Sequence, residues 1–389
     1  MRKPALLISL ALLALLAPAG RAAPAREVPP GFVGMNADGP LLTANSGLEA
    51  SFGSMVRSGV ESIRSAFYWS QIQPYASFAE IPPNQRATFT DVGGVPTDFS
   101  ATDSLVGGAA RRRFSILPVV LFAPPWDSRH PGQFSSPPSD PAPYARFLAA
   151  LAARYGPGGT FWKQHPQVPS DPIRDWQIWN EPDSTKYWSD QPFVDGYAAL
   201  LKAADGALKA VDRGARVVLA GFPSRSWVSL ARLYAAGARP YFDVVAIHPF
   251  TLPVFNVLRI LAQDRRVMSA HGDSHKPIYI TETSWPSAKD RTSIRYGFEV
   301  TQAGQARKAH QLLTTLGRVH ARYGLERVFW YTWLSFDSST TSPFDYAGLL
   351  TVGPGGKLVP KPAFKTFKHT ALRIEGCTAK RVIATVCSR

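Results

Sequence analysis

One stretch of the chain reads Ile116-Leu117-Pro118-Val119-Val120-Leu121-Phe122, seven residues without a polar side chain among them. A strand with one face in water alternates apolar and polar residues, whereas a strand buried on both faces need not. The lack of alternation, together with the β-branched residues, indicates a strand in a parallel sheet that is covered on both faces.

Eight runs of this kind, most of them rich in β-branched or aromatic residues, follow one another at residues 31–36, 62–69, 114–122, 175–180, 216–222, 242–248, 277–282 and 327–334. Segments with helical spacing of apolar residues lie between them, at 144–155, 193–211, 231–238, 254–270 and 303–323, with weaker ones at 48–58 and 105–113. This alternation predicts an α/β fold, a (β/α)8 TIM barrel. An open doubly wound sheet is disfavoured because the glycine-rich phosphate loop that usually follows its first strand is missing.

The chain has 389 residues, which suits a single barrel with insertions. Two proline- and glycine-rich stretches interrupt the alternation, residues 73–99 after the second strand and 123–143 after the third. Loops from strand to helix project from the barrel face that carries active sites. We therefore expect one barrel domain at residues 26–373, with long loops after strands 2 and 3 as the walls of a cleft.

The N-terminus has the layout of a secretory signal peptide. Arg2 and Lys3 precede an apolar stretch at residues 5–17, and small residues that suit cleavage follow. The stretch is short for a membrane span, so an uncleaved anchor is the less favoured alternative. We expect residues 1–25 to be removed on export and the mature protein to be secreted, with no membrane attachment; the periplasm and the cell wall are alternative destinations.

Two cysteines, Cys377 and Cys387, lie close together near the C-terminus. In an exported chain this spacing predicts one disulfide that pins a C-terminal tail at residues 374–389, and two free thiols are the alternative. No other cysteine is present to form a cysteine metal site.

The formal net charge is +15, and the basic residues are scattered along most of the chain. Scattered charge is typical of a solvated surface, although attraction to an anionic polysaccharide is a second interpretation. No nucleic-acid-binding motif is visible, so we expect no nucleic acid partner. Nothing in the sequence indicates an oligomeric state.

Two of the predicted strands end in a glutamate. The fourth reads Trp176-Gln177-Ile178-Trp179-Asn180-Glu181-Pro182, and its proline stops the strand directly after the carboxylate. The seventh reads Ile278-Tyr279-Ile280-Thr281-Glu282. In a barrel both carboxylates point into the same mouth from opposite sides. Glycoside hydrolysis needs such a pair, because one group protonates the leaving oxygen and the other attacks or directs water.

These motifs resemble the 4/7 superfamily of retaining glycosidases, clan A, and within it families 39 and 5. The resemblance covers nearly the whole expected mature chain, since all eight strands fall in order. It implies that Glu181 is the acid/base, that Glu282 is the nucleophile and that Asn180 binds the sugar 2-hydroxyl.

The resemblance extends to three other strands. Arg64 matches an arginine of strand two, and His248 matches a histidine of strand six. Both are expected to help to keep Glu282 ionised. Trp333 matches a tryptophan of strand eight that forms the floor of a sugar subsite. One departure is Phe250, where tyrosine is usual.

The hydroxyl that such a tyrosine would bring to the nucleophile is therefore lost, or it is supplied by another side chain. Tyr279 and Tyr331 are the candidates.

Aromatic residues are abundant, with 10 Trp, 13 Tyr and 22 Phe. Flat apolar rings stack on the C–H faces of pyranoses, so Trp69, Trp126 and Trp285 are candidates for outer subsites, with core packing about equally favoured. Trp179 and Trp188 are expected to surround Glu181 and to raise its pKa.

The sequence therefore predicts a secreted retaining β-glycosidase that cleaves a polysaccharide or oligosaccharide, with endo action slightly favoured. The alternative is a carbohydrate-binding surface protein on the same barrel with little or no catalysis. No cofactor is expected because two carboxylates suffice. No metal is expected because His248 lacks partner ligands at metal spacing.

Overall fold

The computed structural model describes residues 25–43, 47–223 and 225–388. Apart from Ala25, the predicted signal peptide lies outside the described residues. No helix in the part of the chain that is described combines the length and the hydropathy that crossing a membrane requires.

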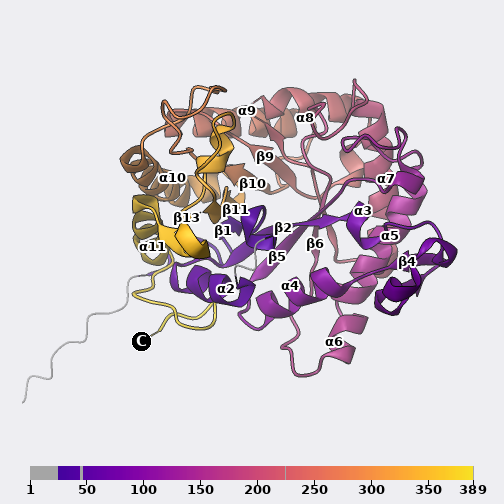
Figure 1. Cartoon of the computed structure of the whole chain (residues 1–389). Helices are drawn as coiled ribbons and strands as arrows, with labels where there is room; N and C mark the ends of the chain where they lie inside the picture. Colours follow the sequence, from indigo (N-terminus) through magenta and orange to yellow (C-terminus); the bar gives the residue numbers. More distant parts are fainter. Residues whose placement is uncertain (1–24, 44–46, 224, 389) are drawn as a thin grey trace, which may run out of the picture.

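Nine parallel strands among the described residues curl into an α/β barrel in the middle of the molecule, with helices around them (Figure 1). They are β1 (Val33–Asn36), β2 (Ser62–Tyr68), β5 (Ser115–Leu121), β6 (Asp175–Ile178), β7 (Arg216–Val218), β8 (Phe222–Pro223), β9 (Val245–His248), β10 (Ile278–Thr283) and β11 (Leu325–Trp330). Their order in the sheet is β7-β6-β5-β2-β1-β11-β10-β9-β8. The predicted α/β barrel is confirmed, because each predicted run overlaps at least one of these strands.

The barrel closes at the fifth predicted strand, which is broken into β7 and β8. β7 pairs with β6 and β8 pairs with β9. Val218 also bridges to Val244, and the Leu219 amide donates a 3.0 Å hydrogen bond to the Val244 carbonyl. Between the two halves, Gly221 has a φ of 73°, and a Cβ atom there would collide with the His248 ring. Glycine is therefore needed at this position both for the backbone and for the space that His248 occupies.

Eight helices follow the strands in turn and cover the outside of the barrel. They are α2 (Leu48–Arg57), α4 (Ser100–Ala110), α5 (Pro141–Tyr155), α7 (Val194–Val211), α8 (Ser226–Ala235), α9 (Val254–Ala270), α10 (Gln302–Tyr323) and α11 (Pro362–Ile374). Short helices α1 (Pro40–Thr43), α3 (Trp69–Ile72) and α6 (Thr160–Gln164) lie in the connections. Seven of the eight overlap predicted helical segments, and α11 was not predicted as a helix.

The connections at the carboxyl ends of the strands carry further small elements. The segment after β2 contains a hairpin of β3 (Thr90–Val92) and β4 (Val95–Thr97). After β11, β12 (Leu334–Ser335), β13 (Leu350–Val352) and β14 (Leu358–Pro360) form a separate three-stranded sheet. The eighth predicted strand is therefore too long, because the chain leaves the barrel after Trp330.

The C-terminal tail is fastened to the barrel by a disulfide and by buried charges. Cys377 and Cys387 are bonded to each other, as predicted. Between them, the fully buried Lys380 ammonium lies 2.7 Å from Glu61 Oε1 and 2.6 Å from Glu375 Oε2. Burial raises the pKa of Glu375 to about 8. One ammonium between two side-chain carboxyl groups therefore ties the tail to the start of β2 and to the end of α11.

A double Cys377→Ser/Cys387→Ser variant should remain folded but lose stability. A disulfide acts mainly by restricting the unfolded chain, and closing a loop with a separation of 10 residues stabilises by about 2–3 kcal/mol. Urea unfolding followed by circular dichroism, with intact and reduced wild type as references, measures the loss. An unchanged midpoint would mean that the tail unfolds independently of the barrel.

Candidate active site

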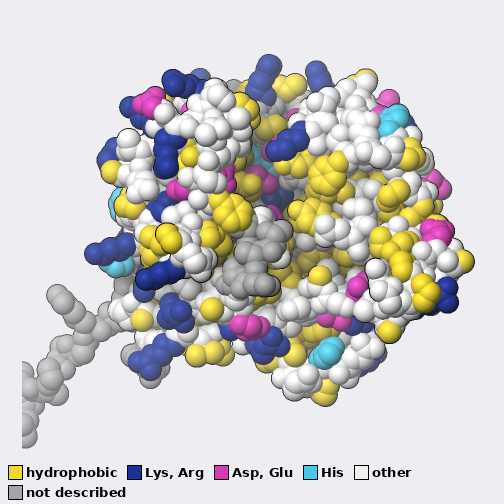
Figure 2. Space-filling view, viewed as in Figure 1, with side chains coloured by type: hydrophobic (Ala, Val, Ile, Leu, Met, Phe, Trp, Pro, Cys, Tyr) yellow, Lys and Arg dark blue, Asp and Glu magenta, His cyan; other side chains and the backbone are white. Residues whose placement is uncertain are grey.

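A cavity of about 580 Å³ lies at the carboxyl ends of the barrel strands. In Figure 2 it appears as a hollow near the middle of the face, with acidic and histidine side chains inside and hydrophobic side chains around it. Its lining comes from Asp38 after β1, from the Glu181–Tyr187 region after β6, from Phe250 after β9, and from segments after β10 and β11. The long loops after strands 2 and 3, predicted as cleft walls, contribute no residue to this cavity.

Arg64 is the centre of the polar network beneath this cavity. Its guanidinium, only 2% exposed, donates four hydrogen bonds of 2.7 Å each. The acceptors are side-chain oxygens of Asn36, Gln177, Asn180 and Glu282. These residues come from β1, from β6 and the residues directly after it, and from β10. Arg64 therefore holds together side chains from different strands, and its ion pair with Glu282 puts a positive charge next to that carboxylate, as predicted.

His248 contacts the other glutamate of the site, Glu181. Its Nδ1 is 2.6 Å from Glu181 Oε1, and its Nε2 is 2.9 Å from Thr281 Oγ1. Burial lowers the pKa of His248 to about 4, so the ring is neutral at pH 7. The prediction that His248 helps to keep Glu282 ionised is therefore wrong, because an uncharged ring 3.9 Å from Glu282 supplies no positive charge.

The carboxyl group of Glu181 sits in a low-dielectric position. Burial raises its pKa to about 7, against the opposing effect of the Lys186 and Arg64 charges. The direction agrees with the prediction. The predicted neighbours Trp179 and Trp188 are themselves buried and pack edge to face, with their ring centroids 5.3 Å apart.

The backbone around Glu181 is strained. Trp179 has a φ of 67° and Glu181 a φ of 40°, and residues other than glycine rarely adopt such positive values. The Glu181 amide donates a 3.3 Å hydrogen bond to the Ala220 carbonyl. Asn180 lies between these two positive-φ residues. Its side chain contacts Arg64, whereas the side chain of Glu181 lines the cavity.

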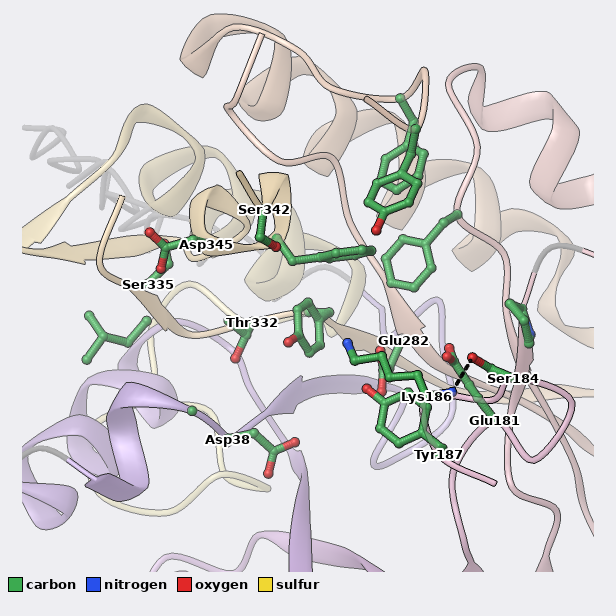
Figure 3. Close-up of a pocket in the computed structure, with 18 residues that line it drawn as sticks. Asp38, Glu181, Ser184, Lys186, Tyr187, Glu282, Thr332, Ser335, Ser342 and Asp345 are labelled. Carbon is green, nitrogen blue, oxygen red and sulfur yellow. Dashed lines mark hydrogen bonds between the residues drawn. The ribbon is translucent and has the colours of Figure 1, made fainter. Parts of the chain in front are cut away.

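Glu181 and Glu282 come close enough to act on one bond. One oxygen from each carboxylate and one nitrogen of His248 all lie within 4.8 Å of one another. Figure 3 shows Glu181 and Glu282 on the same side of the cavity, next to Lys186 and Tyr187.

The same three residues are the one group among the described residues that could offer ligand atoms to a metal ion. A cation there would meet the Arg64 charge, which lies 2.7 Å from Glu282. Both nitrogens of His248 are already engaged in hydrogen bonds. The arrangement therefore suits paired carboxylate chemistry better than metal binding.

The predicted tryptophan subsites are not where the sequence suggested. Trp69, Trp285 and Trp333 are fully buried in the core, so they have no surface left to contact a ligand. Trp126 is partly buried, packs edge to face on Trp69 and donates its indole N–H to the Gln73 carbonyl. None of the four lines the cavity. For Trp69, Trp285 and Trp333 the prediction is wrong, because a tryptophan close to a strand end has either the barrel interior or the helix layer beside it, and the sequence does not say which. For Trp126, which keeps some exposed surface, an outer subsite stays a prediction.

Tyr331, two residues before Trp333, does line the cavity. Its ring lies edge-on to Phe250, with 6.4 Å between ring centroids. The other candidate, Tyr279, places its hydroxyl 2.9 Å from Asp175, in the buried layer at the opposite end of the barrel. Of the two predicted tyrosines, only Tyr331 is therefore positioned to replace the hydroxyl that Phe250 lacks.

Several lining residues were missed because they lie in irregular segments. These are Asp38, Lys186, Tyr187, Tyr296, Phe298 and Phe344. Asp38 accepts a 3.0 Å hydrogen bond from the Ala66 amide. Residues in loops show no periodicity, so nothing in the sequence indicated them beyond their position after a strand.

Comparison with solved structures relates the fold to glycoside hydrolases. A family 39 glycoside hydrolase from Bacteroides cellulosilyticus WH2 matches with a TM-score of 0.64 and 17% identity, over 90% of this chain and 64% of that one. A monomeric beta-xylosidase from Caulobacter crescentus CB15 matches at 0.62 and 18%, over 90% and 69%. The GH53 catalytic domain from Ignisphaera aggregans matches at 0.55 and 18%, over 89% and 98%.

The chain thus spans less than two thirds of the first of these structures. No family model matches the sequence. No curated protein sequence matches it significantly either. At these identities the likeness concerns the fold, which this chain shares with family 39 enzymes and also with a family 5 enzyme from Bifidobacterium longum.

A Lys186→Met variant should raise the pKa of Glu181 above its value of about 7. The Lys186 charge is the largest influence that lowers this pKa, so removing it favours the protonated carboxyl group. Carbon-13 NMR of labelled glutamate across pH 5 to 9 measures the titration, with Lys202→Met, on α7, as the control. A pKa that falls in Lys186→Met would contradict the assignment.

Proposed function

We propose that this chain is a retaining β-glycosidase, with Glu181 as acid/base and Glu282 as nucleophile. The observation that carries the proposal is the pairing of two unlike carboxyl groups within 4.8 Å. One is partly buried, and desolvation raises its pKa to about 7, so it holds a proton near neutral pH. The other is ion-paired to Arg64 at 2.7 Å.

The separation of the two groups supports retention. Retaining glycosidases place their carboxyl groups about 5–5.5 Å apart, whereas inverting enzymes leave roughly 6.5–9.5 Å so that a water molecule fits between carboxylate and sugar. One oxygen of Glu181 lies within 4.8 Å of one oxygen of Glu282, which is closer to the retaining spacing than to the inverting one. Direct attack by Glu282 on the sugar is therefore favoured.

The reaction proceeds in two steps. Protonated Glu181 gives its proton to the glycosidic oxygen while a Glu282 oxygen bonds to the anomeric carbon, so that the leaving group departs as an alcohol. Glu181, now ionised, takes a proton from water as that water attacks the same carbon and releases Glu282. In the interval the nearby Lys186 charge stabilises the Glu181 carboxylate.

Asn180 is prepared to bind a hydroxyl group of the substrate. Arg64 donates to Asn180 Oδ1 at 2.7 Å, which fixes the amide so that its NH₂ group is left to donate. We assign this donor to the sugar 2-hydroxyl, a contact that strengthens in the transition state.

The proposed substrate is a β-linked polysaccharide or oligosaccharide, cleaved within the chain. Support for a sugar comes from the aromatic rings in the cavity lining and from the fold shared with glycoside hydrolases. Export is supported by the leader-like N-terminus and by the Cys377–Cys387 disulfide.

A carbohydrate-binding protein without turnover is the second candidate, and Phe250 favours it. That residue puts a phenyl ring where the families that this chain resembles usually have a tyrosine hydroxyl. Glycan binding without any product release would support it.

The proposal is tested with activated 2-deoxy-2-fluoro β-glycosides of xylose, glucose and galactose. The fluorine slows the second step, so a glycosyl label should accumulate on Glu282 and be located by peptide mass spectrometry. Glu282→Gln should take up no label, whereas Glu80→Gln, a surface change on the loop after β2, should label as wild type does. Label on another residue would refute the assignment.

Glu181→Gln should separate substrates by their leaving groups. For a substrate whose leaving group needs no proton, kcat/KM of the variant should stay close to that of wild type, because the variant has lost only the ability to protonate the leaving group. Substrates with poor leaving groups should lose about 10²–10⁴-fold in kcat/KM. For wild type, kcat/KM on poor leaving groups should fall as the pH rises through about 7, where Glu181 loses its proton. Equal losses on both substrate types would remove Glu181 from the acid role.

A further inference from the structure

Phe134 is an aromatic residue whose side chain is exposed to solvent. It is 69% exposed, and no large hydrophobic side chain among the described residues is more exposed. It lies in the segment between β5 and α5, outside the lining of the central cavity. A large apolar ring in this position has no role in the core.

A row of rings connects Phe134 to the cavity. The Phe134 ring centroid is 3.8 Å from that of Phe122, at an interplanar angle of 44°. Phe122 in turn stacks with Tyr187 at 6.2 Å and 13°. Tyr187 lines the cavity beside Glu181 and Lys186 (Figure 3). Phe134 is thus the outer member of an aromatic row whose inner member borders the catalytic pair.

The segment that carries Phe134 is held against the loop after β6. Asp190, on that loop, lies 2.7 Å from His130 and 3.1 Å from Arg129. The Ser189 amide donates a 2.8 Å hydrogen bond to the carbonyl of Ser135, the residue next to Phe134. These contacts fix the position of the ring relative to Glu181, whose loop this is.

We propose that Phe134 forms an outer subsite, on which one pyranose unit of a bound glycan chain stacks away from the bond that is cleaved. The inference rests on the proposed glycosidase function and adds the length of chain that the cleft recognises. The axial C–H groups of a β-linked pyranose form an apolar face that matches an exposed ring. A ring outside the lining of the cavity adds contact surface beyond the cavity, which favours a chain over a single sugar.

The test compares Phe134→Ala with wild type on a short and a long substrate. The short one is an activated aryl β-glycoside, and the long ones are β-1,4-linked hexasaccharides of glucose, xylose and mannose. On the hexasaccharide that wild type cleaves, KM should rise about 3- to 10-fold, the size of one aromatic contact, with kcat unchanged. The aryl glycoside should show no change in either constant.

Two further variants separate stacking from a general effect. Phe134→Trp keeps a flat ring and should restore wild-type KM on the hexasaccharide. Val382→Ala, at a side chain that is 67% exposed on the C-terminal tail, should leave both substrates unchanged. An equal effect of Phe134→Ala on both substrates, or no effect on the long one, would overturn the subsite.

The subsite can fail or hold independently of catalysis. Calorimetric titration of hexasaccharide into Glu282→Gln, with and without Phe134→Ala, should show 3- to 10-fold weaker binding when the ring is absent, even if wild type hydrolyses nothing. Analytical sedimentation of wild type and Phe134→Ala distinguishes a sugar subsite from a subunit interface. Conversion of a dimer into a monomer, with hexasaccharide binding unchanged, would make Phe134 an interface residue and overturn the proposal.

Discussion

The site depends on one buried cation. Arg64 is almost without solvent, and a guanidinium in that position is tolerated only when its N–H groups are paired and a negative charge lies close by. The barrel supplies both, because the ends of β1, β6 and β10 bring acceptors to the arginine of β2. The strands that close the barrel therefore also bring the residues of the site together. Removing Glu282 would leave an unpaired charge on Arg64 as well as remove the proposed nucleophile.

Local irregularities of the backbone occur where the site needs space or a turn. The break between β7 and β8 contains Gly221, which leaves room for the His248 ring. The left-handed residues Trp179 and Glu181 aim neighbouring side chains at different partners. Such conformations cost of order 1–3 kcal/mol each, and they persist because packing and the hydrogen bonds of Asn180 and His248 fix the surrounding chain.

The sequence predicted the barrel because unbroken apolar runs are a property of each strand by itself. It predicted Glu181 and Glu282 because polar residues at strand ends stand out against such runs. Arg64, which lies inside β2, was predicted only through the resemblance to the 4/7 glycosidases. It did not predict which carboxylate His248 contacts, since that depends on how far β9 lies from its neighbours. It misplaced Trp333 for a similar reason: the chain leaves the barrel after Trp330, which turns Tyr331 to the cavity and Trp333 to the core. Loop residues such as Tyr187 follow no period, and only the folded chain reveals them.

Glu181 and Glu282 have different electrostatic surroundings, although one oxygen of each lies within 4.8 Å of the other. Glu282 has the Arg64 cation beside it, whereas Glu181 has a neutral histidine beside it and a pKa that desolvation raises. His248 must remain uncharged for this contrast to hold, because an imidazolium 2.6 Å from Glu181 would favour the loss of the proton that the acid needs. Burial of the ring, which lowers the pKa of His248 to about 4, prevents this at neutral pH. The raised pKa of Glu181 comes from its own desolvation, and a neutral His248 adds no charge that would oppose it. In the proposed mechanism, this difference from Glu282 sets which of the two glutamates is the acid.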